Sequence, residues 1–129
     1  MRLLLLEDDA TTVESIRLCL EIYEPQSSLK TTGKGLEALQ LLKDNQYDAI
    51  LIDLGLPDID GTEVIEQLRQ FSNIPAVVLS ARHSPEVIAN ALSLGADDYI
   101  TKPFDYRLLL KRVNNLVNKS AHKEKGSGN

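Results

Sequence analysis

Residues 48–61 read DAILIDLGLPDIDG, a short apolar run that ends in an acid and leads into a loop rich in glycine, proline and aspartate. The run from Ala49 to Ile52 does not alternate apolar and polar residues. It therefore predicts a strand that is buried on both faces, as in a parallel sheet covered by helices. The turn-forming residues that follow end this strand, so Asp53 is expected at its carboxyl end.

The same unit recurs along the chain, because short apolar runs alternate five times with segments of helical spacing. The runs lie at residues 3–6, near residue 29, and at 49–52, 76–79 and 99–100. The predicted apolar helix faces are Val13, Ile16, Leu20 and Tyr23; Leu36, Leu39 and Leu42; Val64, Ile65 and Leu68; Val87, Ile88, Ala91 and Leu92; and Leu109, Leu110, Val113, Leu116 and Val117. Five strand–helix units predict an α/β fold, a doubly wound parallel sheet with helices on both faces.

The length of 129 residues, with 43% hydrophobic and 26% charged residues, fits one globular domain. We expect this domain to span residues 1–118 and the polar residues 119–129 to form a flexible tail or a truncated linker. The single cysteine, Cys19, lies among apolar residues and is expected to pack in the core.

The net charge of −5 at pH 7 argues against direct contact between this domain and nucleic acid. The apolar residues at the N-terminus are too few for a signal peptide or a membrane span. The predicted location is therefore the cytoplasm, without membrane attachment.

Residues of complementary chemistry end the predicted strands: Glu7 and Asp8 the first, Asp53 the third, Ser80 the fourth and Lys102 the fifth. Doubly wound sheets bind ligands beyond these carboxyl ends. Three carboxylates within about 4 Å would repel by roughly 4 kcal/mol per pair at an effective dielectric near 20, so a cation is needed between them. Mg²⁺ fits, because it accepts one or two carboxylates and completes its shell with water and phosphate oxygens. A lysine and a hydroxyl would bind that phosphate, so the set predicts a phosphoryl-transfer site.

Four stretches, in this order and spacing, resemble response regulator receiver domains over residues 2 to about 118. They are EDD at 7–9, the quoted stretch at 48–61, SA at 80–81 and GADDYITKPF at 95–104. The resemblance implies a flavodoxin-like (βα)5 fold with strand order 2-1-3-4-5. It also implies that the chain is no enzyme beyond catalysing its own aspartyl phosphorylation and dephosphorylation.

The resemblance assigns the phosphoacceptor and the metal ligands. Asp53 would receive phosphate from a histidine kinase. Glu7, Asp8, Asp53 and the backbone carbonyl of Gly55 would hold Mg²⁺.

The resemblance also assigns the residues around the phosphoryl group. Ser80 and Lys102 would bind it, and Ser80 and the aromatic Tyr99 would shift when it arrives. The bond between Lys102 and Pro103 would be cis. Arg82 and Gly55 would lie beside the phosphate, where residues tune its hydrolysis.

The segment at 95–104 looks most like receivers joined to winged-helix DNA-binding domains, which implies a transcriptional output outside this chain. Such receivers pair through the fourth helix, fifth strand and fifth helix, and charged residues suited to that pairing are Asp97, Asp98, Lys111 and Arg112. The fourth helix departs from this pattern at Ile88, Asn90 and Ser93. A stand-alone phosphorelay receiver is the alternative.

Other interpretations exist for the acids. Asp8 or Asp9 could cap a helix, Asp53 could start a turn, and Ser80 could cap the fourth helix. The stretch DIDGT at 58–62 matches the nucleophile signature of haloacid-dehalogenase-like phosphatases. That signature directly follows a strand in those enzymes, whereas here the strand has already ended at Asp53, and Gly55, Leu56 and Pro57 intervene. A receiver that binds a partner without phosphorylation has little support, since every phospho-site residue type is present.

Overall fold

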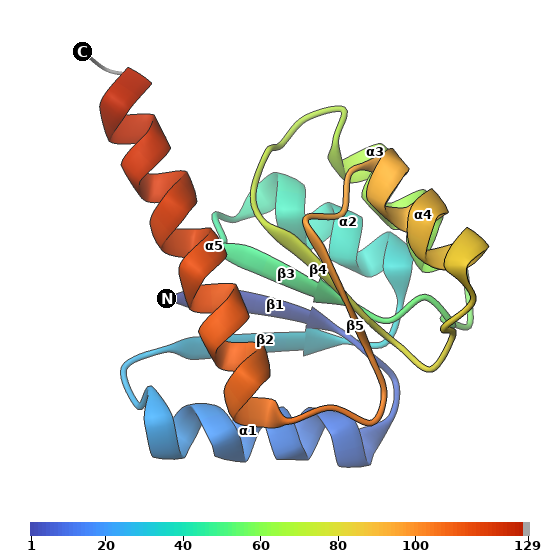
Figure 1. The fold of residues 1–129 in the computed structure, drawn as a ribbon, viewed down its shortest axis with the longest axis horizontal. Helices are drawn as coiled ribbons and strands as arrows, with labels where there is room; N and C mark the ends of the chain where they lie inside the picture. The colour runs from blue at the N-terminus through green and yellow to red at the C-terminus, as the bar shows by residue number, and fades with distance from the viewer. Residues whose placement is uncertain (128–129) are drawn as a thin grey trace.

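The computed structural model describes the backbone of residues 1–127 and the side chains of residues 1–121. Five strands alternate with five helices, as predicted (Figure 1). In chain order they are β1 (Arg2–Leu6), α1 (Ala10–Tyr23), β2 (Ser28–Thr32), α2 (Gly35–Asp44), β3 (Ala49–Ile52), α3 (Gly61–Leu68), β4 (Ala76–Ser80), α4 (Pro85–Leu94), β5 (Asp98–Thr101) and α5 (Tyr106–Ser127).

The strands form one parallel sheet in the order β2-β1-β3-β4-β5, which confirms the predicted topology. The order reverses direction beside β1, because the chain goes from β1 outward to β2 and then returns to β3 on the other side. Leu6, the last residue of β1, pairs with Ile52, the last residue of β3. The acids that follow these two strands therefore leave the sheet side by side.

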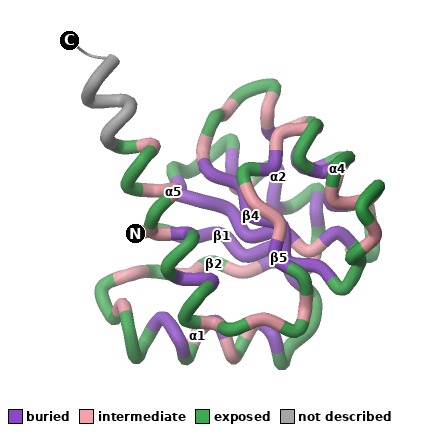
Figure 2. The backbone as a smooth tube through the Cα atoms, viewed as in Figure 1, coloured by how far each residue is buried: buried purple, intermediate pink, exposed green. Residues whose placement is uncertain are grey.

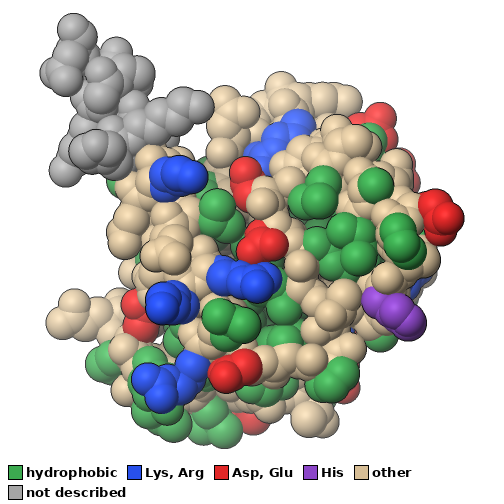
Figure 3. Space-filling view, in the orientation of Figure 1, with side chains coloured by type: hydrophobic (Ala, Val, Ile, Leu, Met, Phe, Trp, Pro, Cys, Tyr) green, Lys and Arg blue, Asp and Glu red, His purple; other side chains and the backbone are tan. Residues whose placement is uncertain are grey.

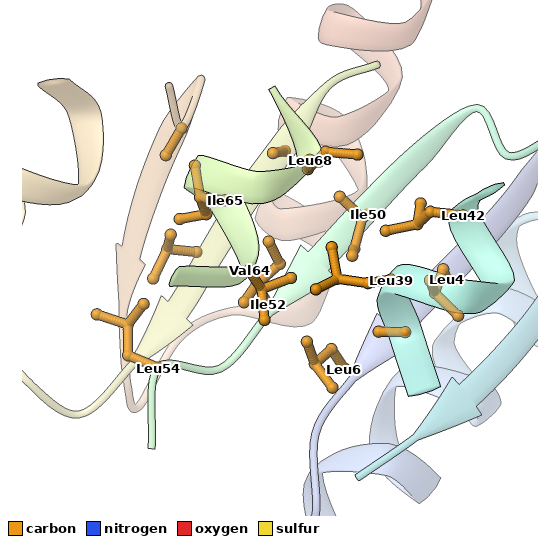
Figure 4. Close-up of a cluster of buried hydrophobic side chains, with 14 of the residues drawn as sticks. Leu4, Leu6, Leu39, Leu42, Ile50, Ile52, Leu54, Val64, Ile65 and Leu68 are labelled. Atoms are coloured by element: carbon orange, nitrogen blue, oxygen red, sulfur yellow. The ribbon is translucent and has the colours of Figure 1, made fainter. Parts of the chain in front are cut away.

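Side chains alternate between the two faces of the sheet, with a separate core on each. The buried residues concentrate on the strands in the middle of the molecule (Figure 2). On one face, Leu4 and Leu6 of β1 and Ile50 and Ile52 of β3 pack against α2, α3 and α4. Figure 4 shows Val64, Ile65 and Leu68 of α3 over these strand residues. On the other face, the intervening strand residues pack against α1 and α5. Cys19 is buried in this second core, as predicted.

Three residues predicted on apolar helix faces are exposed instead: Tyr23, Leu36 and Leu92. In α2 the buried face is centred on the small residues Gly35 and Ala38, not on Leu36. A Cβ atom at Gly35 would lie 2.7 Å from Cγ1 of Ile59, so the missing side chain lets the helix approach the β3–α3 loop. Helical spacing predicted a face but not its centre.

The last helix does not end near residue 117, where the apolar pattern stops. It continues to Ser127, while residues 128–129 lie outside the described part of the chain. Lysine, glutamate and alanine are good helix formers, so the loss of apolar periodicity does not end the helix. That residues 119–129 form a linker stays a prediction. No described helix has the length and apolar character needed to cross a membrane.

Arg69, at the end of α3, binds the loops at the amino ends of β4 and β5, away from the acids that follow the strands. Its guanidinium donates to the carbonyls of Gly95, Ser72 and Ile74 and pairs with Asp97 at 3.0 Å. The arginine side chain is only 19% exposed. This cluster joins the loops that precede β4 and β5.

We expect Arg69→Met to lower the free energy of unfolding by about 2–3 kcal/mol, because partly buried carbonyl groups would lose a charged donor. Urea unfolding measures this change. Arg107→Met is the control, because that guanidinium only lies over the Tyr23 ring, 4.8 Å from its centre. Arg107→Met should lower the free energy of unfolding by about 0.5–1 kcal/mol. Equal losses in the two variants would contradict the assigned role of Arg69.

Candidate metal and phosphoryl site

The carboxyl ends of β1 and β3 bring three acids together. The amide of Asp53 donates to the carbonyl of Leu6 at 2.9 Å, which extends the β1–β3 pairing by one residue beyond the strands. One carboxylate oxygen from each of Glu7, Asp8 and Asp53 lies within 4.8 Å of the other two. The predicted convergence of these acids is therefore present.

Lys102 reaches the same place from the end of β5. Its ammonium donates to Oε1 of Glu7 at 2.5 Å. Glu7 is only 3% exposed, and its second oxygen, Oε2, is buried without a hydrogen-bond partner among the described residues. An unpaired buried carboxylate oxygen is costly, because it has lost its water and gained no donor.

The pKa values of Glu7 and Lys102 are shifted by burial and by the neighbouring charges. Burial, followed by the contact with Asp53, raises the pKa of Glu7 to about 7 in spite of Lys102. For Lys102, burial alone would lower the pKa, but the hydrogen bond to Glu7 and the charge of Asp53 raise it above its usual value. One lysine therefore does not neutralise the cluster.

Asp9, not Asp8, caps the following helix. The Asp9 carboxylate accepts from the amide and hydroxyl of Thr12 at the start of α1, and the hydroxyl contact chiefly lowers the pKa of Asp9. Asp8 is exposed and is left available to a ligand.

The loop after Asp53 is closed by Gly61, whose amide donates to the carbonyl of Leu54 at 2.9 Å. A Cβ atom at Gly61 would lie 2.6 Å from the carbonyl oxygen of Asp53. Only glycine permits this approach, which places the first turn of α3 against the backbone of Asp53. Gly55, the predicted source of a carbonyl ligand, lies exposed in this loop.

Asp58 and Asp60 both cap helices. Asp58 accepts from the first two amides of α2, and these bonds, that to Leu36 first, lower the pKa of Asp58. Asp60 accepts from the amide and hydroxyl of Thr62 at the start of α3. Asp58 is also not among the clustered acids. Both acids of this stretch therefore act as helix caps, and the capping role of Asp58 was not predicted from the sequence.

Ser80 ends β4 at the same edge, and its carbonyl accepts from the amide of Lys102 at 2.8 Å. Its hydroxyl accepts from the amide of Arg82 at 3.1 Å. The capping residue of α4 is Ser84, not Ser80. No hydrogen bond joins Ser80 to Asp53 among the described residues, so the phosphoryl-binding role of Ser80 stays a prediction.

Arg82 connects three elements around the site. Its guanidinium pairs with Asp60 at 3.2 Å, and its carbonyl accepts from the hydroxyl of half-buried Tyr99 at 2.6 Å. These bonds were not predicted from the sequence. Beyond Tyr99 in β5, the Lys102–Pro103 peptide bond is cis, which confirms the prediction.

The residues present fit a divalent metal. Oxygen ligands converge, one of them is buried without a partner, and the single lysine leaves an excess of negative charge. Hard divalent cations prefer such oxygen donors. Glu7, Asp8 and Asp53 are the residues that would hold the ion.

Comparisons with known proteins agree with this geometry. The sequence profile described as "Response regulator receiver domain" matches residues 3–114. The cell cycle response regulator CtrA of Brucella ovis is 40% identical over 121 residues, which are 93% of this chain and 51% of that protein. The chain thus spans about half the length of the curated relatives it matches.

Solved structures also align with the chain. The receiver domain of the Francisella response regulator 1452 has a TM-score of 0.85 at 36% identity, covering 92% of this chain and 98% of that one. The Mn²⁺-bound form of response regulator Rcp1 has a TM-score of 0.76 at 27% identity, covering 88% of this chain and 89% of that one.

The raised pKa of Glu7 predicts a dependence of stability on pH in the metal-free protein. Because the folded pKa exceeds the unfolded value, the folded state holds a proton that the unfolded state releases between about pH 4.5 and about pH 7. The contribution of Glu7 to stability is present at low pH and lost as the pH rises through about 7.

Glu7→Gln removes this titration. In a chelator, we expect the variant to unfold at a higher temperature than the native chain at pH 8, with a smaller difference at pH 5.5. Thermal unfolding followed by circular dichroism measures both temperatures. A difference that does not change with pH would contradict the assigned pKa.

Proposed function

Since the chain belongs to the response regulator receiver domain family, we propose that Asp53 accepts a phosphoryl group and that Mg²⁺ is the ion held beside it. Receiver domains bind a divalent metal at an acidic pocket, and histidine kinases phosphorylate response regulators. The observation that carries the proposal is the convergence of Glu7, Asp8 and Asp53 with Lys102 at one edge of the sheet. The existence of a Mn²⁺-bound form of the response regulator Rcp1 supports the binding of a divalent ion.

In the proposed reaction, an oxygen of Asp53 attacks the phosphorus of a phosphohistidine. The new O–P bond forms as the P–N bond breaks, and the imidazole leaves with the electron pair. The bound ion supplies neutralisation of charge on the phosphoryl oxygens. Lys102 binds a phosphoryl oxygen through its ammonium, and the Ser80 hydroxyl donates to another. Turnover is confined to the chain's own acceptor, so we do not expect hydrolysis of generic phosphate esters.

The switch that follows would use Ser80 and Tyr99. The Ser80 oxygen accepts from the Arg82 amide, so a movement of Ser80 toward a phosphoryl dianion, to which its O–H donates, also moves the loop at Arg82. Arg82 also accepts from the Tyr99 hydroxyl, so a movement of this loop changes the support of the aromatic ring. The surface formed by α4, β5 and α5 would then differ between the two states.

A small phosphodonor such as acetyl phosphate tests the acceptor. We expect intact-mass spectrometry to show the gain of one phosphoryl group with Mg²⁺, and none with a chelator or in Asp53→Asn. Asp48→Asn is the matched control, because Asp48 precedes the opposite end of β3 and should not affect labelling. Labelling of Asp53→Asn at the native rate would defeat the proposal.

We propose further that the phosphorylated chain forms a homodimer through the α4–β5–α5 face and regulates transcription through a winged-helix domain outside this chain. Charges of both signs are interspersed on the side of the molecule that shows α5 and β5 (Figure 3). The net charge of −5 supports the proposal that this domain makes no direct contact with nucleic acid. We propose the cytoplasm as its location, which is typical of receiver domains.

Asp98 and Arg112 are the pair to test, because they already contact each other at 3.6 Å within one chain. Asp97 is bound to Arg69 and to the amide of Ala76, so it is less available to a partner. In such dimers, the intrachain pair would be exchanged for pairs between protomers.

With phosphodonor and Mg²⁺, we expect Arg112→Glu to weaken dimerisation in sedimentation velocity. The double variant Asp98→Arg/Arg112→Glu should restore it, because the opposite charges are regained. Arg107→Glu is the control, since Arg107 faces Tyr23 of α1. Dimerisation unaffected by Arg112→Glu would contradict this interface.

A further inference from the structure

Asp58 makes contacts that join two loops far apart in the sequence. Its two carboxylate oxygens accept from the amides of Gly35 and Leu36, each at 2.9 Å. These are the first two residues of α2, and Lys34, the residue before them, provides no side-chain cap. The β3–α3 loop therefore caps a helix that begins more than 20 residues earlier.

The start of α2 is attached to the acids that follow β1. The carbonyl of Thr32 accepts from the amide of Glu7 at 2.9 Å. The next residue, Gly33, packs on Asp8, and a Cβ atom at Gly33 would lie 3.2 Å from that of Asp8. The segment from Thr32 to Leu36 is thus fixed to one side of the acidic cluster.

Asp58 itself belongs to the β3–α3 loop, which follows Asp53. Asp58 lies three residues after Gly55, in the loop closed by the hydrogen bond between Gly61 and Leu54. The neighbouring Ile59 packs closely on Gly35. The β3–α3 loop is therefore attached to α2 at two adjacent points, one polar and one apolar.

We propose that Asp58 is a positioning residue of the divalent-metal site, which fixes the loop carrying the Gly55 carbonyl relative to Asp8. This inference rests on the proposed function, which makes Gly55 and Asp8 ligands of the ion. Asp58 does not itself touch the ion. Its two hydrogen bonds set the distance between groups on opposite sides of the site, and small errors in ligand position weaken metal binding.

The charge of Asp58 suits this role. Its two amide donors, that of Leu36 first, hold the pKa of the carboxyl below its usual value, so the group stays ionised at neutral pH. Both oxygens are used, which fixes the orientation of the carboxylate. A helix cap alone would stabilise α2 without affecting the affinity for metal.

The test measures Mn²⁺ affinity by the electron paramagnetic resonance signal of the free ion, with the full chain and no phosphodonor. We expect Asp58→Ala to weaken Mn²⁺ binding on the order of tenfold. Asp58→Asn keeps one acceptor oxygen and should give an intermediate affinity. Asp58→Asn alters the side chain less than Asp58→Ala does, so the test still holds if the alanine variant does not fold.

Asp105→Ala is the matched control, because Asp105 likewise accepts from two amides at the start of a helix, those of Arg107 and Leu108. We expect it to lower the unfolding temperature as Asp58→Ala does, with native Mn²⁺ affinity. Faster hydrogen exchange at the Gly35 and Leu36 amides should accompany the loss of affinity in the Asp58 variants.

Native affinity in Asp58→Ala would overturn the inference, as would an equal loss in Asp105→Ala, which would indicate general destabilisation. A native chain that binds no Mn²⁺ would instead defeat the proposed function. The two failures are therefore distinguishable.

Discussion

Repulsion among three carboxylates at the carboxyl edge of the sheet is the interaction on which the rest of the site depends. Glu7, Asp8 and Asp53 are held together by the pairing of β1 with β3, which is set by the buried apolar residues of both strands. The free energy of burying those residues maintains an arrangement that the charges alone would oppose. Lys102 offsets part of the repulsion and leaves one oxygen of Glu7 without a partner.

The repulsion among these carboxylates explains why the surrounding loops need contacts that hold them in place. Caps, a close glycine and an ion pair fix each loop near the acids: Asp9 at α1, Asp58 at α2, Gly61 at α3 and Arg82 at the β4–α4 loop. A set of like charges in loose loops would move apart. Because the loops are held, the preference of the site for a cation is built into the fold before an ion binds.

The sequence was sufficient for the strands and for the residues at their ends. Uninterrupted apolar runs predicted buried parallel strands. Because such sheets bind ligands at the carboxyl ends of their strands, the acids after residues 6 and 52 were predicted to form the site. The contact of Asp58 with α2 could not be predicted, since its two partners are backbone amides and carry no sequence signal. Leu36 and the length of α5 were misjudged because periodicity gives neither the centre of a buried face nor the end of a polar helix. The cis bond before Pro103 was available only through family resemblance.

The distance along the chain between Glu7 and Lys102, 95 residues, has a consequence for biosynthesis. A nascent chain that has emerged as far as β3 already contains Asp53 but lacks the lysine that completes the cluster. The same holds for any proteolytic fragment cut before β5. Assembly of the acidic cluster with its lysine is thereby coupled to synthesis of β5, and a product truncated before β5 carries the clustered acids without their counter-charge.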